Sequence, residues 1–325
     1  MDHGGELERL QSENEYLQDR LNDVYASTSW RATAPLRAVQ RVLARRAVVR
    51  RMWKARMVQQ YGTRMPIVYD GELPDSIGRL DAGDARACAI VHAFHLDLLP
   101  EIVERLSLCG RLHHAIVSHP PHLRSEDVLA HCQPLIDRGV QVNAQRLPNR
   151  GRDVLPFVSV VEQALNTGCE AFIKVHTKKS GYLPDQRGEV WRTGLLTGLL
   201  PSPDNIERIV AFVVNAPVAG FAAPRRWIST VDEDIRDRRV LRQLERRGDI
   251  RRWGRARRSF PAGTMFWCGR NWLEFVRDLG LRPNEFDPEP MRHVAGVAHA
   301  MERLIGSFVA DRRASVWLTS FGDDR

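Results

Sequence analysis

The sequence predicts an α/β protein with an open sheet and flanking helices, preceded by a coiled-coil segment and a basic helical segment. Three observations support this class. Short apolar runs alternate with amphipathic stretches from Ala87 onward, 43% of the residues are apolar and 27% are charged, and no internal repeat is visible. A chain of 325 residues with this composition can bury one large core or two modest ones, which excludes extensive disorder.

Residues 1–30 predict a short coiled coil. Apolar residues alternate there at spacings of three and four, and Asn14 falls at a seam position where a buried Asn fixes register and favours two parallel strands. The seam consists of Leu7, Leu10, Asn14, Leu17, Leu21 and Val24. Because fewer than three heptads are marginal alone, two interpretations stay open: a homodimer formed through residues 7–24, or an ordinary solvated helix.

Residues 31–84 predict a basic amphipathic helix followed by a linker. Residues 31–69 hold ten basic residues and no acidic one, so the net charge of +8 is concentrated there. Apolar side chains recur among the arginines of residues 31–61, which suits peripheral contact with an anionic membrane surface. A linker helix packed on its own domain is the alternative. The prolines and glycines of Gly62 to Asp84 predict the linker itself.

No membrane-spanning helix, secretory signal or nucleic-acid site is predicted. The longest nearly uncharged run, Ile209 to Pro224, is about 16 residues, short of the roughly 20 needed to span a bilayer. The N-terminus has neither a basic nor an apolar signal region, so we expect a cytoplasmic chain, with peripheral membrane contact as the alternative above. The Arg-rich stretch 225–258 lacks the interleaved aromatic residues of a stacking platform, so nucleic acid is not an expected partner.

The main domain is expected over residues 85–310, with a tail over 311–325. Short apolar runs bounded by turn residues predict its strands, and apolar residues at helical spacing predict its helices. The predicted strands are Cys88–Phe94, His114–Ser118, Val140–Ala144, Ala171–Val175, Val218–Ala222 and Thr264–Cys268. The predicted helices are Leu98–Leu108, Ser125–Arg138, Val154–Thr167, 189–199, 203–214, 271–279 and 291–305, with an Arg-rich helical insertion over 232–258.

Polar residues collect at the ends of the predicted strands, where ligands of open α/β sheets bind. They are His92, His95, Ser118, His119, the run Pro148 to Asp153 and the run Lys174 to Ser180. The glycine-rich patterns of dinucleotide-binding folds and of P-loops are both absent from the sequence. We therefore expect a ligand site of another kind at these strand ends.

The run Asn149-Arg-Gly-Arg-Asp153 lies between a predicted strand and a predicted helix. Asn149 and Gly151 permit the backbone angles of a tight turn, and the following helix N-terminus presents free N–H groups. Arg150 and Arg152 supply planar forks for phosphate. Asp153 is explained equally well as the cap of the helix.

The run that ends at Ser180 contains three of only four lysines in the chain. Lys178 and Lys179 supply compact positive charge, and His176 and Thr177 add hydrogen-bonding groups, a combination that suits a diphosphate whose negative charge grows as it leaves. A plain basic loop is the alternative.

Two further segments offer contacts to a ligand. Trp191, beside Arg192, offers a face for a base or a sugar, although a half-buried Trp is the commoner outcome. Gly263 allows close approach of the backbone, and the hydroxyl of Thr264 can hydrogen-bond a sugar hydroxyl.

Several acidic residues near the last helix are candidates for a general base. His299 and Glu302 are spaced i, i+3 and share a helix face, as a base with its orienting partner or as a surface hydrogen-bonded pair. Glu285, Asp287 and Glu289 precede that helix. The spacing alone does not choose among them.

Together these residues resemble the rhamnan synthesis protein F family, in order over roughly residues 88–308. The matching runs are Val91-His-Ala-Phe-His-Leu-Asp-Leu-Leu99, Asn149-Arg-Gly-Arg-Asp153, Phe172-Ile-Lys-Val-His-Thr-Lys-Lys-Ser180, Trp191-Arg192, Gly263-Thr-Met-Phe-Trp267 and Ala298-His-Ala-Met-Glu-Arg303. Trp30-Arg-Ala-Thr-Ala-Pro-Leu36 also resembles a segment that accompanies bacterial polysaccharide glycosyltransferases. The resemblance implies assembly of rhamnose-containing surface polysaccharide from a nucleotide sugar, dTDP-rhamnose, onto a glycan or lipid-linked glycan acceptor.

The order of elements is similar to that of a GT-A glycosyltransferase, in which one strand ends in a metal-binding Asp-x-Asp. Here the corresponding strand ends in His176-Thr-Lys-Lys179. The resemblance implies that lysines replace the metal and that no cofactor is required, and the alternative of a divalent cation stays open. Asp232-Glu-Asp234 lies in the charged insertion and is interpreted as a solvated face.

The sequence therefore predicts a glycosyltransferase, specifically a rhamnosyltransferase, of bacterial surface-polysaccharide assembly. Arg150, Arg152, Lys178 and Lys179 are expected to hold the donor diphosphate. His176 is expected to assist the leaving group, and a carboxylate near the last helix to deprotonate the acceptor. The alternative is a non-catalytic glycan-binding or scaffolding module that partners a separate glycosyltransferase.

Overall fold

The computed structural model describes most of the chain after Met65. The described residues are 66–74, 77, 80–177, 179, 187–230, 237–250, 258–288 and 296–321. They belong to the second of two compact units, Pro66–Arg325, the first being Met1–Met65. The predicted coiled coil and basic helix therefore lie outside the described residues.

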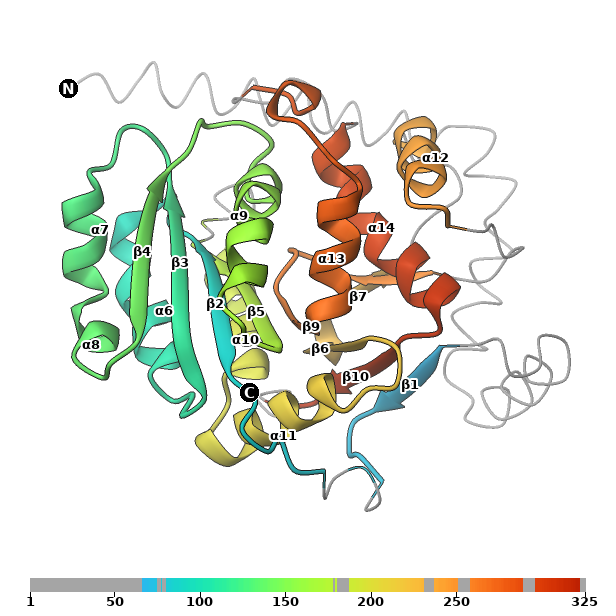
Figure 1. Ribbon diagram of the computed structural model, residues 1–325, viewed down its shortest axis with the longest axis horizontal. Helices are drawn as coiled ribbons and strands as arrows, with labels where there is room; N and C mark the ends of the chain where they lie inside the picture. Colours follow the sequence, from blue (N-terminus) through green and yellow to red (C-terminus); the bar gives the residue numbers. More distant parts are fainter. Residues whose placement is uncertain are drawn as a thin grey trace, which may run out of the picture. The chain divides into compact units, whose positions relative to one another are not determined.

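The core of the second unit is an eight-stranded sheet with the order β1-β10-β6-β9-β5-β2-β3-β4 (Figure 1). Its strands are β1 Ile67–Asp70, β2 Ala87–His92, β3 Leu112–His119, β4 Gln141–Arg146, β5 Ala171–His176, β6 Gly220–Pro224, β9 Phe266–Gly269 and β10 Ser315–Thr319. Neighbouring strands are parallel except where β9 runs antiparallel to β5 and β6. A separate two-stranded ribbon pairs β7, Ile228–Thr230, with β8, Ser259–Pro261.

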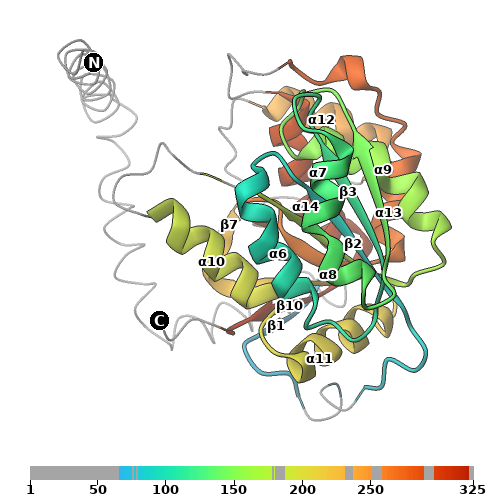
Figure 2. The same cartoon turned by 90° about the vertical axis from the view of Figure 1, so that its left-hand side faces the viewer.

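Helices cover both faces of the sheet. They are α6 Leu99–Leu106, α7 Ser125–His131, α8 Gln133–Ile136, α9 Val154–Asn166, α10 Arg187–Leu199, α11 Pro203–Val214, α12 Arg238–Arg247, α13 Arg270–Asp278 and α14 Val297–Arg312, with short 3-10 turns at Leu96–Leu98, Arg225–Trp227 and Pro283–Glu285. One apolar core joins the sheet to α6, α7, α8, α10 and α11, and the other joins it to α9, α12, α13 and α14. Figure 2 shows α6 and α10 on one side of the sheet and α9 and α13 on the other.

Alternation along β2 shows how the sequence builds both cores. Ala87, Ala89 and Val91 face the first core, and Cys88 and Ile90 face the second. Because successive side chains of a strand point to opposite faces, a strand that is buried on both sides is apolar throughout. The predicted α/β class, with an open sheet and flanking helices, is confirmed.

The predicted strands and helices of the main domain overlap observed elements, with one predicted helix divided in two. Ser125–Arg138 breaks at Cys132 into α7 and α8. Pro134 lies in the first turn of α8 and has no N–H to continue the ladder of α7, so the break falls just before it.

The sheet extends beyond the predicted domain bounds of 85 and 310. β1 lies in the predicted linker, and β10 lies in the predicted tail. β1 is short and largely exposed, and β10 buries Ser315, Trp317 and Thr319 while its other residues are half-buried. Small polar residues at buried positions hide the apolar alternation by which a strand is predicted.

The last helix also differs from its predicted bounds of 291–305. α14 begins at Val297 and continues to Arg312, ending at Arg313 in the left-handed conformation. Residues 291–295 lie outside the described part of the chain. No described helix is both long enough and apolar enough to cross a membrane.

The strand order reverses between β2 and β5. The chain moves outward from β2 to β3 and β4, and then returns to place β5 on the other side of β2. Ligands of open α/β sheets bind in the crevice beyond the carboxyl ends of the strands at such a reversal. β2 and β5 end in His92 and His176, which are register partners.

We expect β10 to be part of the core and not a dispensable tail. Trp317 is 1% exposed, and its Nε1 donates to the carbonyl of Gly71 at 2.6 Å. Trp317→Ala should lower the free energy of unfolding by about 3–5 kcal/mol, as measured by urea denaturation. The control Leu318→Ala, at the half-buried neighbour, should cost clearly less. Equal, small losses would show that β10 is not packed as described.

Candidate functional site

Buried polar residues gather where β2, β3 and β5 end. His92, Ser118, Lys174 and His176 are each 9% exposed or less. His92 lies two residues after Ile90 in β2, and its register partners are Ser118 in β3 and His176 in β5. Lys174 is the register partner of Ile90 itself. All four side chains therefore point to the same face of the sheet as Ile90. This face carries α9 and α14, so the cluster lies between the sheet and these helices.

The centre of the cluster is an ion pair between Lys174 and Asp153. The Lys174 ammonium lies 2.5 Å from Asp153 Oδ2, with side-chain exposures of 4% and 15%. It also donates to the carbonyl of Thr264 at 2.8 Å and to the Thr264 hydroxyl oxygen at 3.0 Å. All three ammonium protons therefore have acceptors, which is the condition under which a buried charge is tolerated.

Asp153 is held as a carboxylate. Burial alone would raise its pKa, but the charges of His176 and Lys174, with hydrogen bonds from Lys174 and Thr264, hold the pKa well below its ordinary value. Asp153 stands at the N-cap position of α9, yet its side chain makes no capping hydrogen bond. The structure therefore assigns this carboxylate to Lys174 and Thr264.

Two residues beside the pair adopt left-handed backbone conformations. Arg152 has φ 55° and Thr264 has φ 53°, and the second is rare for a β-branched residue. Gly151 and Gly263, immediately before them, also have positive φ, and a Cβ on Gly151 would lie 2.5 Å from the ring of Phe286. Such strain persists only where surrounding contacts fix it, and it concentrates at functional sites.

The loop at Gly263, which lies between β8 and β9 in the chain, hydrogen-bonds to both β5 and α14. His176 Nε2 donates to the carbonyl of Gly263 at 2.8 Å and lies 3.7 Å from Asp153 Oδ2. The N–H of Gly263 donates to Glu302 Oε1 at 3.0 Å. One short loop therefore fixes a histidine from the sheet and a carboxylate from the helix.

His92 is the buried histidine at the end of β2. Its Nδ1 lies 3.0 Å from Ser118 Oγ. Burial lowers its pKa to about 3, so the imidazole is neutral at physiological pH. Next to it, Thr177 Oγ1 accepts the backbone N–H groups of Phe94 and His95, each at 2.8 Å, which ties the loop after β2 to the end of β5.

The turn 149–153 packs against the segment before α14. The Arg150 guanidinium donates to the carbonyl of Phe286, and the N–H of Gly151 donates to the carbonyl of Asp287 at 2.9 Å. Arg152 Nη1 lies 3.3 Å from His299 Nε2. The structure therefore brings the turn, Asp287 and His299 together, and Asn149 is exposed beside them.

Other predicted site residues have partners of their own. Lys179 pairs with Asp97 at 2.6 Å, and Arg192 pairs with Glu101 at 2.9 Å. Trp191 packs on Trp227 with ring centroids 5.9 Å apart. Glu285 forms an ion pair with Arg247 at 2.7 Å. Lys178, Glu289 and the Asp232–Asp234 run lie outside the described residues.

Sequence reasoning gave no role to Lys174 or Ser118, which are central to the cluster. The signal for Lys174 was present, since it is the one charged residue in the apolar strand Ala-Phe-Ile-Lys-Val-His. A lysine at that position needs a buried acid as its partner. Ser118 becomes visible only once the sheet order places β3 beside β2.

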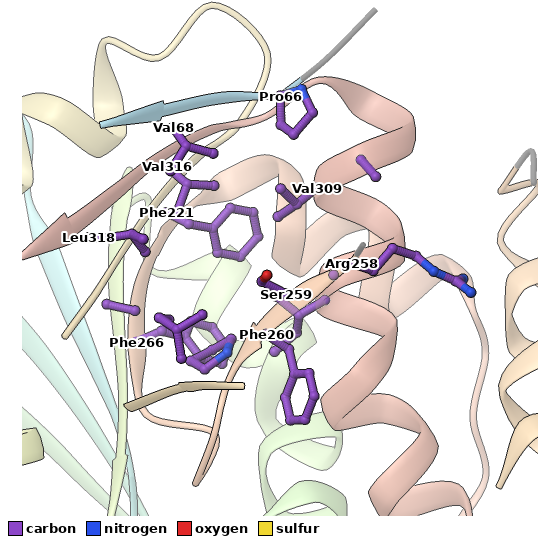
Figure 3. A pocket seen from close by; sticks show the side chains of 16 residues that line it. Pro66, Val68, Phe221, Arg258, Ser259, Phe260, Phe266, Val309, Val316 and Leu318 are labelled. Atoms are coloured by element: carbon purple, nitrogen blue, oxygen red, sulfur yellow. The ribbon is translucent and has the colours of Figure 1, made fainter. Parts of the chain in front are cut away.

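A separate apolar cavity of about 140 Å³ lies between α14 and the β1, β10 and β6 part of the sheet (Figure 3). Its lining is apolar apart from Arg258 and Ser259, and Arg258 is paired with Glu245. It offers no set of polar groups for a diphosphate. Among the described residues, no cluster of three or more His, Cys, Asp or Glu side chains is arranged to hold a metal ion.

The mostly parallel sheet and the polar cluster at its strand reversal define an α/β protein with a candidate ligand site. Comparison with known families is more specific: residues 47–314 match the family described as rhamnan synthesis protein F, and the chain belongs to that family.

Two curated relatives come from two strains of Xanthomonas campestris pv. campestris, and both are described as uncharacterized protein WxcX. They are 32% and 31% identical to this chain over 226 residues. The match covers 68% of this chain and 31% of each relative, so the chain matches about a third of the length of either.

The Lys174 and Asp153 pair should behave as a buried ion pair. Lys174→Met leaves the Asp153 carboxylate buried without its partner and should lower the free energy of unfolding by about 3–5 kcal/mol in urea denaturation. Replacing both residues, Lys174→Met with Asp153→Leu, should recover most of that loss. Arg124→Met, which breaks the exposed pair with Asp127, is the control and should have a negligible effect. A small loss for Lys174→Met would contradict the pairing.

His92 should make stability depend on pH. Its pKa is about 3 in the folded chain against an ordinary 6.5, so between these values the unfolded chain binds more protons and stability falls as the pH falls. His92→Asn keeps a donor toward Ser118 and should reduce the slope of unfolding free energy against pH by about 1.4 kcal/mol per unit in this window. Urea denaturation at several pH values measures the slope, with His113→Asn on β3 as the matched control. An unchanged slope would count against a buried, neutral His92.

Proposed function

We propose that this chain is a glycosyltransferase of bacterial surface-polysaccharide assembly. In this proposal it transfers a sugar, rhamnose, from a nucleotide donor to a glycan or lipid-linked glycan acceptor. The observation that carries the proposal is the cluster of buried polar residues at the strand reversal of a rhamnan synthesis protein F member. The strand order and the polar end of β5 also support a GT-A-like arrangement.

The donor diphosphate is proposed to lie between the turn 149–153 and the end of β5. Arg152 and Lys179 are proposed to supply positive charge there, and the exposed ion pair of Lys179 with Asp97 costs little to exchange for a phosphate. Lys178, which lies outside the described residues, is expected from its sequence position to join them. Arg150 is committed to the carbonyl of Phe286, so its proposed role is to shape the turn. Binding without a metal ion is part of the proposal.

His176 and Thr264 are proposed to position the reacting groups. His176 Nε2 is protonated because it donates to the carbonyl of Gly263, which fixes the ring beside Asp153. Because this N–H is already engaged by Gly263, the proposed role of His176 is to hold the Gly263 loop where the diphosphate departs. Thr264 is held in its strained conformation by Lys174, so its position is set before the substrate arrives.

Asp287 is the proposed general base. His299 is less suited to that role because its Nε2 accepts a hydrogen bond from Arg152, which leaves Nδ1 as the protonated nitrogen of the neutral ring. Glu302 already accepts the N–H of Gly263, and Glu285 is paired with Arg247. The side chain of Asp287 is exposed while its backbone is anchored to Gly151, which suits a base that meets an acceptor from solvent.

The test is calorimetric titration of the whole chain with dTDP-rhamnose, UDP-glucose and GDP-mannose, first in EDTA and then with magnesium or manganese. We expect one nucleotide sugar to bind in EDTA. Lys178→Ala and Lys179→Ala should each weaken that binding about tenfold or more, because charged hydrogen bonds to phosphate are lost. Lys54→Ala, the lysine outside the β5 region, is the control and should leave the affinity unchanged.

A measurement of sugar transfer then distinguishes the proposed glycosyltransferase from a non-catalytic module. Transfer of the sugar to an acceptor glycan, lost in Asp287→Asn with donor affinity retained, would support the transferase. Donor binding that requires a divalent cation would overturn the metal-independent part of the proposal. Binding of no nucleotide sugar under any condition would favour a non-catalytic glycan-binding or scaffolding module.

A further inference from the structure

The last residue of β2, His92, is a histidine whose tautomer is fixed by its contacts. Ser118 Oγ lies 3.2 Å from the carbonyl of Val91 and 3.0 Å from His92 Nδ1. A carbonyl only accepts, so the single hydroxyl proton of Ser118 goes to Val91. Both contacts are then satisfied only if His92 Nδ1 carries a proton and donates it to Ser118 Oγ. A neutral imidazole has one N–H, so His92 Nε2 bears a lone pair.

The surroundings keep this ring neutral. Asp153, His176 and Lys174 are the charged or titratable groups that act on His92, and burial outweighs them, lowering its pKa to about 3. Within the described part of the chain, the His92 ring hydrogen-bonds to Ser118. His92 is 9% exposed and is the last residue of β2.

The lone pair on His92 Nε2 determines which ligand groups can bind beside it. It accepts a hydrogen bond from a hydroxyl or from a ring N–H, and it repels the oxygens of a phosphate, which bear lone pairs without protons. Lys174 is neutralised by its ion pair with Asp153, and the cationic side chains proposed to hold the diphosphate, Arg152 and Lys179, lie on the turn 149–153 and after β5. His92 and these cationic side chains therefore suit different parts of one ligand.

We propose that His92 Nε2 accepts a hydrogen bond from a hydroxyl or ring N–H group of the bound nucleotide sugar, and that Ser118 is the positioning residue that holds His92 in the accepting tautomer. The proposal rests on the proposed function, since it assigns a contact to that ligand. It also orients the ligand, with a neutral donor group at the β2 end and the diphosphate toward the turn 149–153.

The first experiment measures the tautomer without any ligand. Nitrogen-15 NMR of the histidine-labelled full chain, assigned with His92→Asn, should show His92 protonated at Nδ1 and unprotonated at Nε2 from pH 5 to 8. Ser118→Ala should move the population toward protonated Nε2, and Ser118→Thr, which keeps the hydroxyl, should restore the original state. Protonated Nε2 in the unsubstituted chain, or a tautomer indifferent to Ser118→Ala, would overturn the proposed role of Ser118.

The second experiment measures binding. For whichever of dTDP-rhamnose, UDP-glucose and GDP-mannose binds, His92→Asn and Ser118→Ala should each weaken affinity about tenfold, and Ser118→Thr should bind as the unsubstituted chain does. His113→Asn is the matched control. Circular dichroism melting checks that each variant is folded, and His92→Gln provides a second substitution if His92→Asn fails to fold.

Comparison of ligands identifies the group that donates. If the loss in His92→Asn is the same for the nucleotide sugar and for its nucleoside diphosphate, the donor group belongs to the nucleoside, and a loss confined to the nucleotide sugar assigns it to the sugar. Unchanged affinity of folded His92 variants would overturn this inference and leave the proposed function standing. Binding of no nucleotide sugar would overturn both, while the NMR result would still report on Ser118 and His92.

Discussion

The buried pair of Lys174 and Asp153 joins three segments that are distant in the sequence. Lys174 comes from the centre of the sheet, Asp153 from the start of α9, and Thr264, which bonds to both, from the loop before β9. Removing two charges from water is costly, and the cost is offset only when every proton and lone pair finds a partner. This requirement fixes where α9 begins relative to β5, and with it the shape of the turn 149–153.

The strained backbone around the pair follows from that constraint. Thr264 tolerates a left-handed conformation because its carbonyl and hydroxyl are both held by Lys174. Its neighbour Gly263 can then receive His176 on one side and offer its N–H to Glu302 on the other. One loop therefore links the sheet to α14 beside the polar cluster.

The spacing of apolar residues predicted the helices and strands in which buried positions are apolar, and it missed those in which buried positions are polar. The helix 203–214 has the predicted bounds because it carries a continuous apolar stripe, whereas β10 was missed because Ser315 and Thr319 occupy buried positions. The runs that form the cluster were predicted from residue type, but their partners were not. Whether Asp153 caps a helix or pairs with Lys174 depends on the sheet order, a non-local property that no local pattern encodes.

The first and last strands of the described unit are neighbours in the sheet. β1 pairs with β10 in parallel, so the chain enters at one end of this strand pair and leaves at the other, about 16 Å away for strands of this length. A unit whose two ends lie so close can be set into a longer polypeptide without opening its core. Such a unit can occur as one domain of a larger protein. This agrees with the two relatives, each of which is about three times as long as the segment that matches this chain.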